Sequence, residues 1–147
     1  MKVCDAMTKD VKIVSPNHTV QDAAEIMAKI DAGVVPVGDI DKLVGMLTDR
    51  DIAIRAIARG KGPDCKVGDV MTKDVTYCYE DETIDEVSAN LGSHQIRRIP
   101  VLNRDNRLVG ILSLGDLALK DDDSAGEALA GISRPGGSHS QSAAVHQ

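Results

Sequence analysis

The stretch LVGMLTDRD, residues 43–51, returns in the same chain as LVGILSLGD, residues 108–116. Both stretches have a Gly inside an apolar run, followed by a hydroxyl residue and, three positions later, an Asp. The opening KVCDAMTKDV also returns, as KVGDVMTKDV. Because a repeated unit decides the architecture of a whole chain, we interpret the sequence as a tandem duplication. The two copies are expected at residues 2–62 and 66–123.

Hydrophobic periodicity predicts the same order of elements in each copy. In the first copy a β-branched run predicts a short strand at 11–14, and apolar residues spaced i, i+3, i+4 and i+7 predict an amphipathic helix at 20–30. A hairpin of two strands, 33–37 and 42–47, and a second helix at 49–60 follow. Each copy of about 60 residues is too small to bury a core alone. We therefore expect an α/β (α+β) fold in which two β-α-β-β-α repeats pack sheet to sheet with pseudo-twofold symmetry.

Composition and charge argue against several classes of protein. The 147 residues are 42% hydrophobic, and no apolar run approaches the ~18 residues that cross a bilayer. The N-terminus lacks the apolar segment of a secretory signal, so a cytoplasmic protein is expected. A net charge of −6, no Trp or Phe and two Tyr argue against binding to nucleic acid. Three cysteines without CxxC spacing, and histidines without a second ligand, predict free thiols and no metal site.

The spacing of hydroxyl and acid has a simple structural explanation. In a capping box, a Ser or Thr before a helix accepts a hydrogen bond from a free backbone N–H, and the acid three residues later accepts from the backbone N–H of that Ser or Thr. Five pairs have this spacing: Thr19 with Asp22, Thr48 with Asp51, Thr83 with Glu86, Ser113 with Asp116, and Ser124 with Glu127. By itself the spacing therefore predicts five helix starts.

Two of these pairs, Thr48 with Asp51 and Ser113 with Asp116, directly follow a strand that contains Gly. A Gly in a strand lets a ligand or another backbone approach closely. The N-terminus of the following helix favours an anion such as phosphate, and an Asp accepts hydrogen bonds from a diol such as ribose. The motif therefore suits a nucleotide better than a bare anion. No Walker loop, G-x-S-x-G motif or metal-ligand pair predicts catalysis, so we do not expect an enzyme.

The motifs from residue 2 to about residue 120 resemble a tandem pair of CBS domains, the modules named after cystathionine β-synthase. DAMTKDV and DVMTKDV open the two copies, VVPV and RIPV lie in their middles, and GMLTDRD and GILSLGD lie at their ends. The resemblance implies a regulatory sensor, not an enzyme, that binds an adenosine-containing ligand in two clefts between the repeats. AMP, ADP, ATP and S-adenosylmethionine are the ligands it implies, and the regulated partner protein is unknown.

The resemblance also implies which residues meet the ligand. The hydroxyl and acid of each motif would meet ribose and phosphate, the strand before each proline would flank the base, and the first strands would contact the adenine edge. These residues are Thr48, Asp51, Val34, Val35 and Ile13 in the first copy, and Ser113, Asp116, Arg98, Ile99 and Tyr77 in the second. Tyr77 is expected either to cover an adenine face or to pack in the core.

Basic residues distinguish the two copies. Many members of the family have basic residues two and three positions before the proline, where the second copy has Arg97 and Arg98 and the first has none. These arginines form either a solvated strand face or a phosphate clamp. The second cleft is therefore expected to bind phosphorylated ligands more tightly. In the first copy, Arg50 and Arg55 either serve the cleft or pair with Asp51.

Two functions remain open at this point. The chain is either a free-standing sensor whose ligand changes how it meets a partner, or a dimerising scaffold with empty clefts. Ile52, Ile54 and Ile57 lie on more than one face of the second helix, which predicts a homodimer. Beyond the second copy, the sequence allows a short helix at 124–133 and predicts a disordered tail at 134–147.

Overall fold

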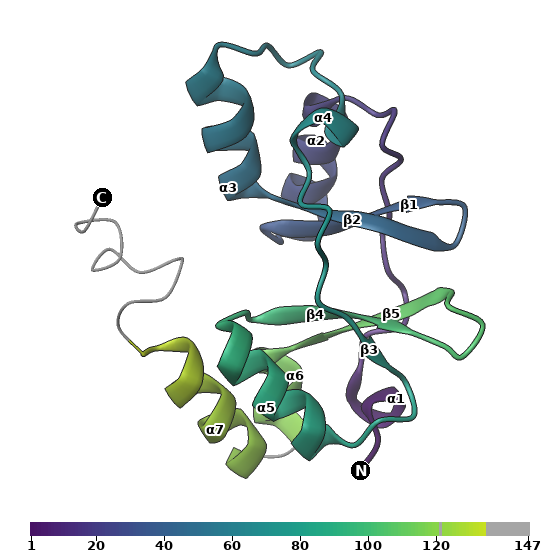
Figure 1. Cartoon of the computed structure of the whole chain (residues 1–147), viewed down its shortest axis with the longest axis vertical. Coiled ribbons are helices and arrows are strands. Elements are labelled where there is room, and N and C mark those ends of the chain that lie inside the picture. Colours follow the sequence, from purple (N-terminus) through teal and green to yellow (C-terminus); the bar gives the residue numbers. More distant parts are fainter. Residues whose placement is uncertain (121, 135–147) are drawn as a thin grey trace. The chain divides into compact units, whose positions relative to one another are not determined.

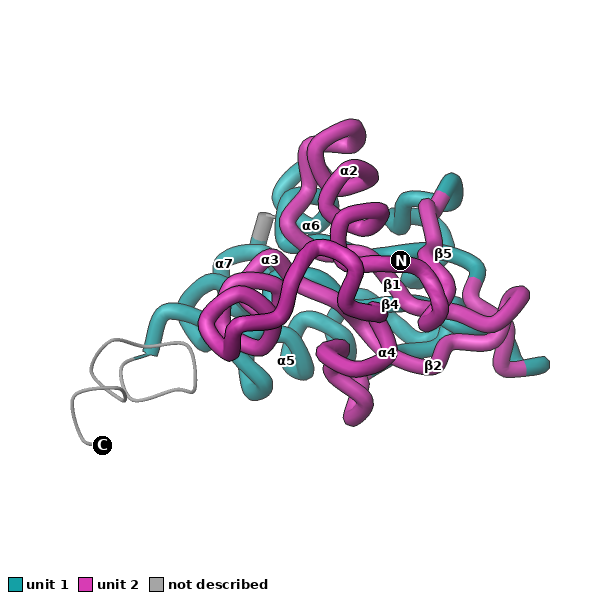
Figure 2. Tube along the Cα trace, turned by 90° about the horizontal axis from the view of Figure 1, so that it is seen from above, with its two compact units in different colours: residues 1–10, 77–105, 109–147 teal, residues 11–76, 106–108 magenta. Residues whose placement is uncertain are grey.

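A computed structural model describes residues 1–120 and 122–134, which divide into two units (Figure 1). Unit 1 contains residues 1–10 and 77–105 and, of the chain from Val109 onward, the described residues 109–120 and 122–134. Unit 2 contains residues 11–76 and 106–108. Figure 2 shows the two units in different colours along the Cα trace. Both units mix helices with a small sheet, so the predicted α+β class is confirmed.

Unit 2 is built on an antiparallel hairpin with helices on one side of it (Figure 1). Its elements are α2 (Val20–Ile30), β1 (Val34–Asp39), β2 (Lys42–Thr48), α3 (Asp49–Asp51), a π-helical turn (Ile52–Ala56), a 3₁₀ turn (Ile57–Arg59) and α4 (Val67–Val70). The three consecutive pieces from Asp49 to Arg59 are called helical segment 49–59 below. This segment ends at Gly60, whose φ of 77° is the left-handed conformation that favours glycine. The predicted hairpin and both predicted helices of the first copy are confirmed.

Unit 1 is built on a three-stranded sheet of order β3-β4-β5, in which β3 is parallel to β4. Its elements are α1 (Val3–Ala6), β3 (Cys78–Tyr79), α5 (Ile84–His94), β4 (Arg98–Leu102), β5 (Leu108–Ser113), α6 (Leu114–Lys120) and α7 (Asp122–Ile132). Helix α7 spans most of the region where the sequence allowed a short helix. The tail predicted at 134–147 lies, beyond Arg134, outside the described residues.

The first strand of the first copy is shorter than predicted, and that of the second copy is equally short. In the segment 11–14 only Val14 pairs, through a single parallel bridge to Val37 in which its N–H donates to the carbonyl of Pro36. The next step of a parallel ladder toward the N-terminus needs an N–H at Pro36, and proline has none. Pro100 holds the same place in unit 1, where β3 has only two residues. Proline in the neighbouring strand therefore ends both ladders.

One of the five predicted helix starts is wrong. Ser124 lies inside α7, which begins at Asp122, and its buried hydroxyl donates to Oδ1 of Asp85 at 3.0 Å. Acidic residues are favourable in the first turn of a helix, and here the helix begins two residues before the serine. Ser124 and Glu127 therefore form no capping box. At the other four starts the hydroxyl accepts from the backbone N–H three residues later.

Each unit combines the body of one sequence copy with the opening segment of the other. In unit 1, Thr8 N–H donates to Ile111 O at 2.8 Å and Ile111 N–H donates to Thr8 O at 3.0 Å. In unit 2, Thr72 and Met46 exchange the same two bonds at 2.8 and 2.9 Å. The spatial units therefore do not coincide with the sequence copies: the segment that opens the first copy belongs to the body of the second, and the reverse.

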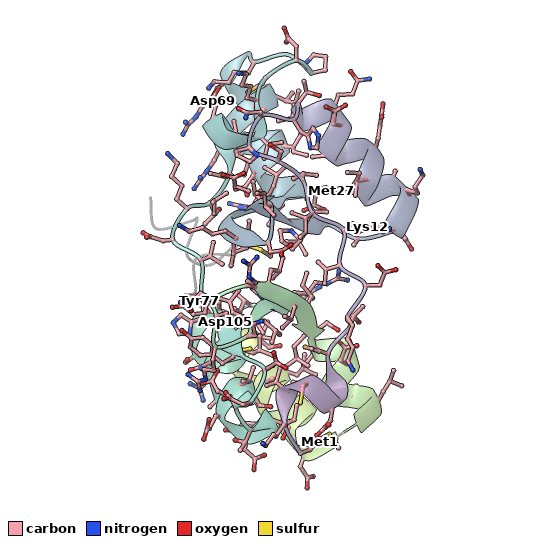
Figure 3. The ribbon with its side chains drawn as sticks, turned by 90° about the vertical axis from the view of Figure 1, so that its right-hand side faces the viewer. Met1, Lys12, Met27, Asp69, Tyr77 and Asp105 are labelled. Carbon is pink, nitrogen blue, oxygen red and sulfur yellow. The ribbon has the colours of Figure 1, made fainter. Side chains whose placement is uncertain are left out.

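Each unit has its own hydrophobic core. Met27, labelled in Figure 3, is a buried residue of α2 in the core of unit 2. The largest fully buried side chains are Val14, Val35, Val37, Leu47, Val67 and Val70 in unit 2, and Val3, Ile84, Leu91, Ile99, Leu112 and Leu117 in unit 1. In the described part of the chain, none of the helices has the length and apolar character needed to cross a membrane.

Candidate functional site

In unit 2 the first motif forms a complete capping box at the end of β2. Thr48 Oγ1 accepts from Asp51 N–H at 3.0 Å, and Asp51 Oδ2 accepts from Thr48 N–H at 3.0 Å. Asp51 is only 7% exposed. The predicted capping box is therefore present, and its two hydrogen bonds hold the carboxylate of Asp51 in one orientation.

Two further side chains contact the carboxylate of Asp51. The Thr72 hydroxyl lies 3.4 Å from Oδ2 and 3.5 Å from Oδ1, and Arg55 Nε lies 3.7 Å from Oδ1. Arg55 also donates to the carbonyl of Met71 at 3.3 Å. Of the two roles considered for Arg55, the structure shows the pairing with Asp51. Thr72 was not predicted, although it lies in the repeated MTKDV, and that repetition singled out the segment.

In unit 1 the second motif has the same geometry with fewer neighbours. Asp116 Oδ2 accepts from Ser113 N–H at 2.9 Å, and Ser113 Oγ accepts from Asp116 N–H at 3.1 Å. Asp116 is half-buried, and Thr8, the counterpart of Thr72, is exposed. Among the described side chains, none donates a hydrogen bond to Asp116 Oδ1. The carboxylate of Asp116 is therefore more accessible than that of Asp51.

The strand glycines make room for another backbone. A Cβ added at Gly45 would lie 2.7 Å from Met71 Sδ and 2.9 Å from Thr72 O. In unit 1, a Cβ at Gly110 would lie 2.6 Å from Met7 Sδ. Of the two reasons considered for these glycines, the close approach of a ligand or of another backbone, the structure shows the second. The glycines thereby let the Met-Thr segments reach the two motifs.

The residues before the prolines point in two directions. Val35 and Ile99 are fully buried in the cores of their units, whereas Arg97 and Arg98 are exposed and Val34 is half-buried. Exposure ends where each strand enters the core, since the residues from Val35 and from Ile99 onward are buried in a continuous run. The exposed and half-buried side chains are therefore the ones that remain available to a ligand.

Main-chain hydrogen bonds join these segments to the helices after the motifs. Asp49 N–H donates to Gly33 O at 2.9 Å, and Leu114 N–H donates to Arg97 O at 2.8 Å. A Cβ at Gly33 would lie 2.8 Å from Asp49 Oδ2. Each unit thus brings its pre-proline segment and its motif together at one place.

Tyr77, labelled in Figure 3, lies directly before β3 and is 45% exposed. Of the two roles considered for it, core packing is therefore wrong. Its ring meets that of Tyr79 edge to face, with 5.7 Å between centroids, and Arg104 lies 4.1 Å above the Tyr79 ring. Arg104 donates two hydrogen bonds of 2.8 Å to Asp81. This hydrogen bonding holds the pKa of Asp81 below its usual value. The counterpart of Tyr77 in unit 2, Ile13, is half-buried.

Neither thiol nor metal chemistry is favoured by the described residues. Cys78 is buried, and this burial raises the pKa of its thiol to about 12, so the thiol is neutral near pH 7. Cys4 and Cys65 are half-buried free cysteines. Within residues 1–120 and 122–134, no three His, Cys, Asp or Glu side chains gather as metal ligands would.

Comparisons with known proteins agree with the repeated motifs. The model of the CBS domain family matches residues 3–57 and 67–123. A CBS domain-containing protein of Bacillus subtilis, YhcV, is 43% identical over 133 residues, which are 89% of this chain and 94% of the relative.

Two solved structures of similar fold contain adenosine derivatives. The CBS domain pair of protein MJ0100, in complex with 5′-methylthioadenosine and S-adenosylmethionine, is 31% identical with a TM-score of 0.72, and the match covers 81% of this chain and 98% of that one. CBSX2 in complex with AMP is 26% identical with a TM-score of 0.73, and the match covers 83% and 96%. CBS domain pairs similar to this chain therefore bind ligands that share an adenosine group.

Proposed function

Because the chain belongs to the CBS domain family, we propose that it is a regulatory sensor of an adenosine-containing ligand. Its ligand is AMP, ADP or ATP, with S-adenosylmethionine as a further candidate. Ligand occupancy changes how the chain meets a partner protein in the cytoplasm, and the chain performs no catalysis. The adenosine derivatives bound by MJ0100 and CBSX2 support this choice of ligand class.

One observation carries the proposal: the capping boxes use only one oxygen of each motif carboxylate. Both boxes place Oδ2 against a backbone N–H, which leaves Oδ1 of Asp116 without a hydrogen-bond donor among the described residues. A carboxylate accepts about four hydrogen bonds through its two oxygens. A ribose diol can therefore bind Asp116 without breaking the helix cap. At Asp51 the ligand competes with Thr72 and Arg55.

The proposed sites follow from these positions. Thr48 with Asp51 and Ser113 with Asp116 bind the ribose and the adjacent phosphate. The exposed side chains of Arg97 and Arg98 meet the phosphate group, since guanidinium groups bind phosphate through paired N–H donors. Val34 in unit 2 and Tyr77 in unit 1 flank the base. Val35 and Ile99 contribute through their backbone because their side chains are fully buried, and the backbone of Ile13 meets the adenine edge.

Titration calorimetry with AMP, ADP, ATP and S-adenosylmethionine tests the proposal, with Asp116→Ala as the main variant. A carboxylate that accepts from ribose contributes roughly 1.5–3 kcal/mol, so Asp116→Ala is expected to weaken binding about 10- to 150-fold. A ligand at 100 times its dissociation constant is also expected to stabilise the chain by about 2.7 kcal/mol.

Asp22→Ala is the matched control. Asp22 closes a capping box with Thr19 through bonds of 3.1 Å, so its replacement removes the same kind of helix cap outside the motifs. Asp22→Ala is expected to lower stability by about 1 kcal/mol, as Asp116→Ala does, without changing nucleotide affinity. If none of the four ligands binds, or if both variants bind equally well, the two motifs are only helix caps and the sensor proposal is wrong.

A dimerising scaffold is the second candidate function. The observation in its favour is that Ile30, Ile54 and Ile57 of unit 2 are 39%, 42% and 59% exposed. Exposed apolar residues mark an interaction site where they form one contiguous patch. A homodimer that forms equally well with and without adenine nucleotides, and that binds none of them, would favour the scaffold.

A further inference from the structure

In unit 2 the carboxylate of Asp51 is already occupied by groups of the chain itself. Its Oδ2 accepts from Thr48 N–H at 3.0 Å and lies 3.4 Å from the Thr72 hydroxyl. Its Oδ1 lies 3.5 Å from the same hydroxyl and 3.7 Å from Arg55 Nε. A carboxylate has about four acceptor sites, and these contacts fill them. A ribose diol can therefore bind Asp51 only after Thr72 or Arg55 has left it.

Both of these side chains connect Asp51 to one short stretch of backbone. The Thr72 hydroxyl belongs to this stretch, and Arg55 Nη1 donates to the carbonyl of Met71 at 3.3 Å. Unit 2 ends shortly after Thr72, and the chain enters unit 1 at Tyr77. The contacts of the Asp51 carboxylate therefore hold the segment through which the chain leaves unit 2.

These contacts are weak enough for a ligand to replace them. Distances of 3.4 and 3.5 Å between the Thr72 hydroxyl and the carboxylate exceed the usual range of about 2.5–3.0 Å. Arg55 is exposed, so water screens its attraction to Asp51. Hydroxyl groups of a ribose are free to approach a carboxylate at the usual, shorter distance. Ligand binding at Asp51 is therefore expected to exchange long contacts for short hydrogen bonds.

The motif of unit 1 differs in this respect. MTKDV recurs at an offset of 64 residues, which makes Thr8 the counterpart of Thr72. The backbone of Thr8 pairs with Ile111 just as that of Thr72 pairs with Met46. The Thr8 side chain is nevertheless exposed, and among the described residues its hydroxyl makes no hydrogen bond to Asp116. A ribose therefore reaches Asp116 without displacing a group of the chain.

We propose that Thr72 and Arg55 hold the unit 2 site in a closed arrangement, and that the ligand opens it by taking the place of the Thr72 hydroxyl on Asp51. The segment 72–76 then loses its side-chain anchor and becomes looser. A ligand at Asp116 has no such effect. The unit 1 site thus binds the ligand, while the unit 2 site also converts its occupancy into a change of the chain. This inference rests on the proposed function and assigns its regulatory step to one of the two sites.

Titration calorimetry with AMP tests the closed arrangement in the whole chain carrying Asp116→Ala, so that the unit 2 site dominates the signal. Thr72→Val keeps the shape of the side chain and removes the competing hydroxyl. It is expected to bind AMP about 2- to 12-fold more tightly, the equivalent of one ordinary hydrogen bond. Thr8→Val makes the same change in the other MTKDV and is the matched control, with unchanged affinity expected.

Arg55→Gln is a second route to the open arrangement if Thr72→Val does not fold by circular dichroism. Because the charge of Arg55 also attracts phosphate, uncharged adenosine is the probe for this variant. Loss of an exposed ion pair is expected to tighten the binding of adenosine by up to about 5-fold.

Hydrogen exchange of the wild-type chain measures the loosening of the segment. With AMP bound, the amides of residues 73–76 are expected to exchange faster, while those of their counterparts at 9–12 are not. Thr72→Val without a ligand is expected to show the same faster exchange at 73–76.

Three results would overturn this inference and leave the proposed function standing in a wild-type chain that binds AMP. They are a folded Thr72→Val chain that binds AMP no more tightly; a Thr8→Val chain whose affinity rises as much; and residues 73–76 that exchange no faster with AMP. A Thr72→Val chain that binds more weakly would make Thr72 a ligand contact instead. A wild-type chain that binds none of the adenosine ligands would contradict the proposed function, and this inference with it.

Discussion

Gly45→Ala tests the exchange of opening segments between the two copies, because it adds one methyl group where the segment 66–76 meets β2. The added Cβ would lie 2.7 Å from Met71 Sδ and 2.9 Å from Thr72 O. The Met71 side chain can rotate away. The Thr72 carbonyl cannot, since it accepts from Met46 N–H at 2.9 Å while Thr72 N–H donates to Met46 O at 2.8 Å.

The magnitude follows from what the methyl group displaces. Overpacking by a methyl group costs about 1–3 kcal/mol, a range that includes the backbone shift by which the two hydrogen bonds lengthen. We expect the free energy of unfolding to fall by about 1–3 kcal/mol, measured by urea denaturation. The melting temperature is expected to fall by about 4 °C for each kcal/mol in a chain of this size.

Gly126→Ala is the control for this prediction. A Cβ at Gly126 meets nothing within 4 Å, and the residue lies in the exposed part of α7. Alanine is favoured over glycine inside a helix by about 0.8–1 kcal/mol, so this variant is expected to be more stable than the wild-type chain. A Gly45→Ala chain as stable as the wild type would show that the segment around Thr72 does not pack against β2.

Two further predictions concern charge and pH. Arg98→Ala is expected to weaken the binding of AMP and ATP and to leave the binding of uncharged adenosine unaffected. Because the arginine is exposed, the loss of affinity is expected to shrink as the salt concentration rises. Calorimetry at two salt concentrations tests this, and an equal loss of affinity for adenosine would contradict it. Burial raises the pKa of the Cys78 thiol from 9.0 to about 12, so with rising pH the thiol ionises in the unfolded chain before it ionises in the folded chain. The stability that the neutral thiol contributes is therefore present below pH 9 and is lost toward pH 12. The free energy of unfolding is expected to fall by up to about 1.4 kcal/mol per pH unit above pH 9, and Cys78→Ala should remove this part of the slope. A wild-type chain and a Cys78→Ala chain with the same pH dependence would show that the thiol is not buried.

Sequence alone determined the repeated architecture and the positions of the two motifs. Helix 20–30, the first hairpin and the capping boxes of Thr48 and Ser113 depend on residues that lie within a few positions of one another. Signals of this kind, a period of 3.6 or 2 and a cap three residues from an acid, act through local hydrogen bonds and the direction of side chains. These local elements can therefore be predicted from the sequence without knowledge of the fold.

Only the tertiary structure decided which distant segments meet. Gly45 indicated a close approach, but the segment that approaches, with Thr72 beside Asp51, comes from the other sequence copy. The spacing at Ser124 predicted a helix cap, whereas the side chain donates to Asp85 of a helix 39 residues away. A contact between distant segments depends on the shape of both surfaces and on the backbone groups each leaves unpaired. No local pattern of residues contains that information.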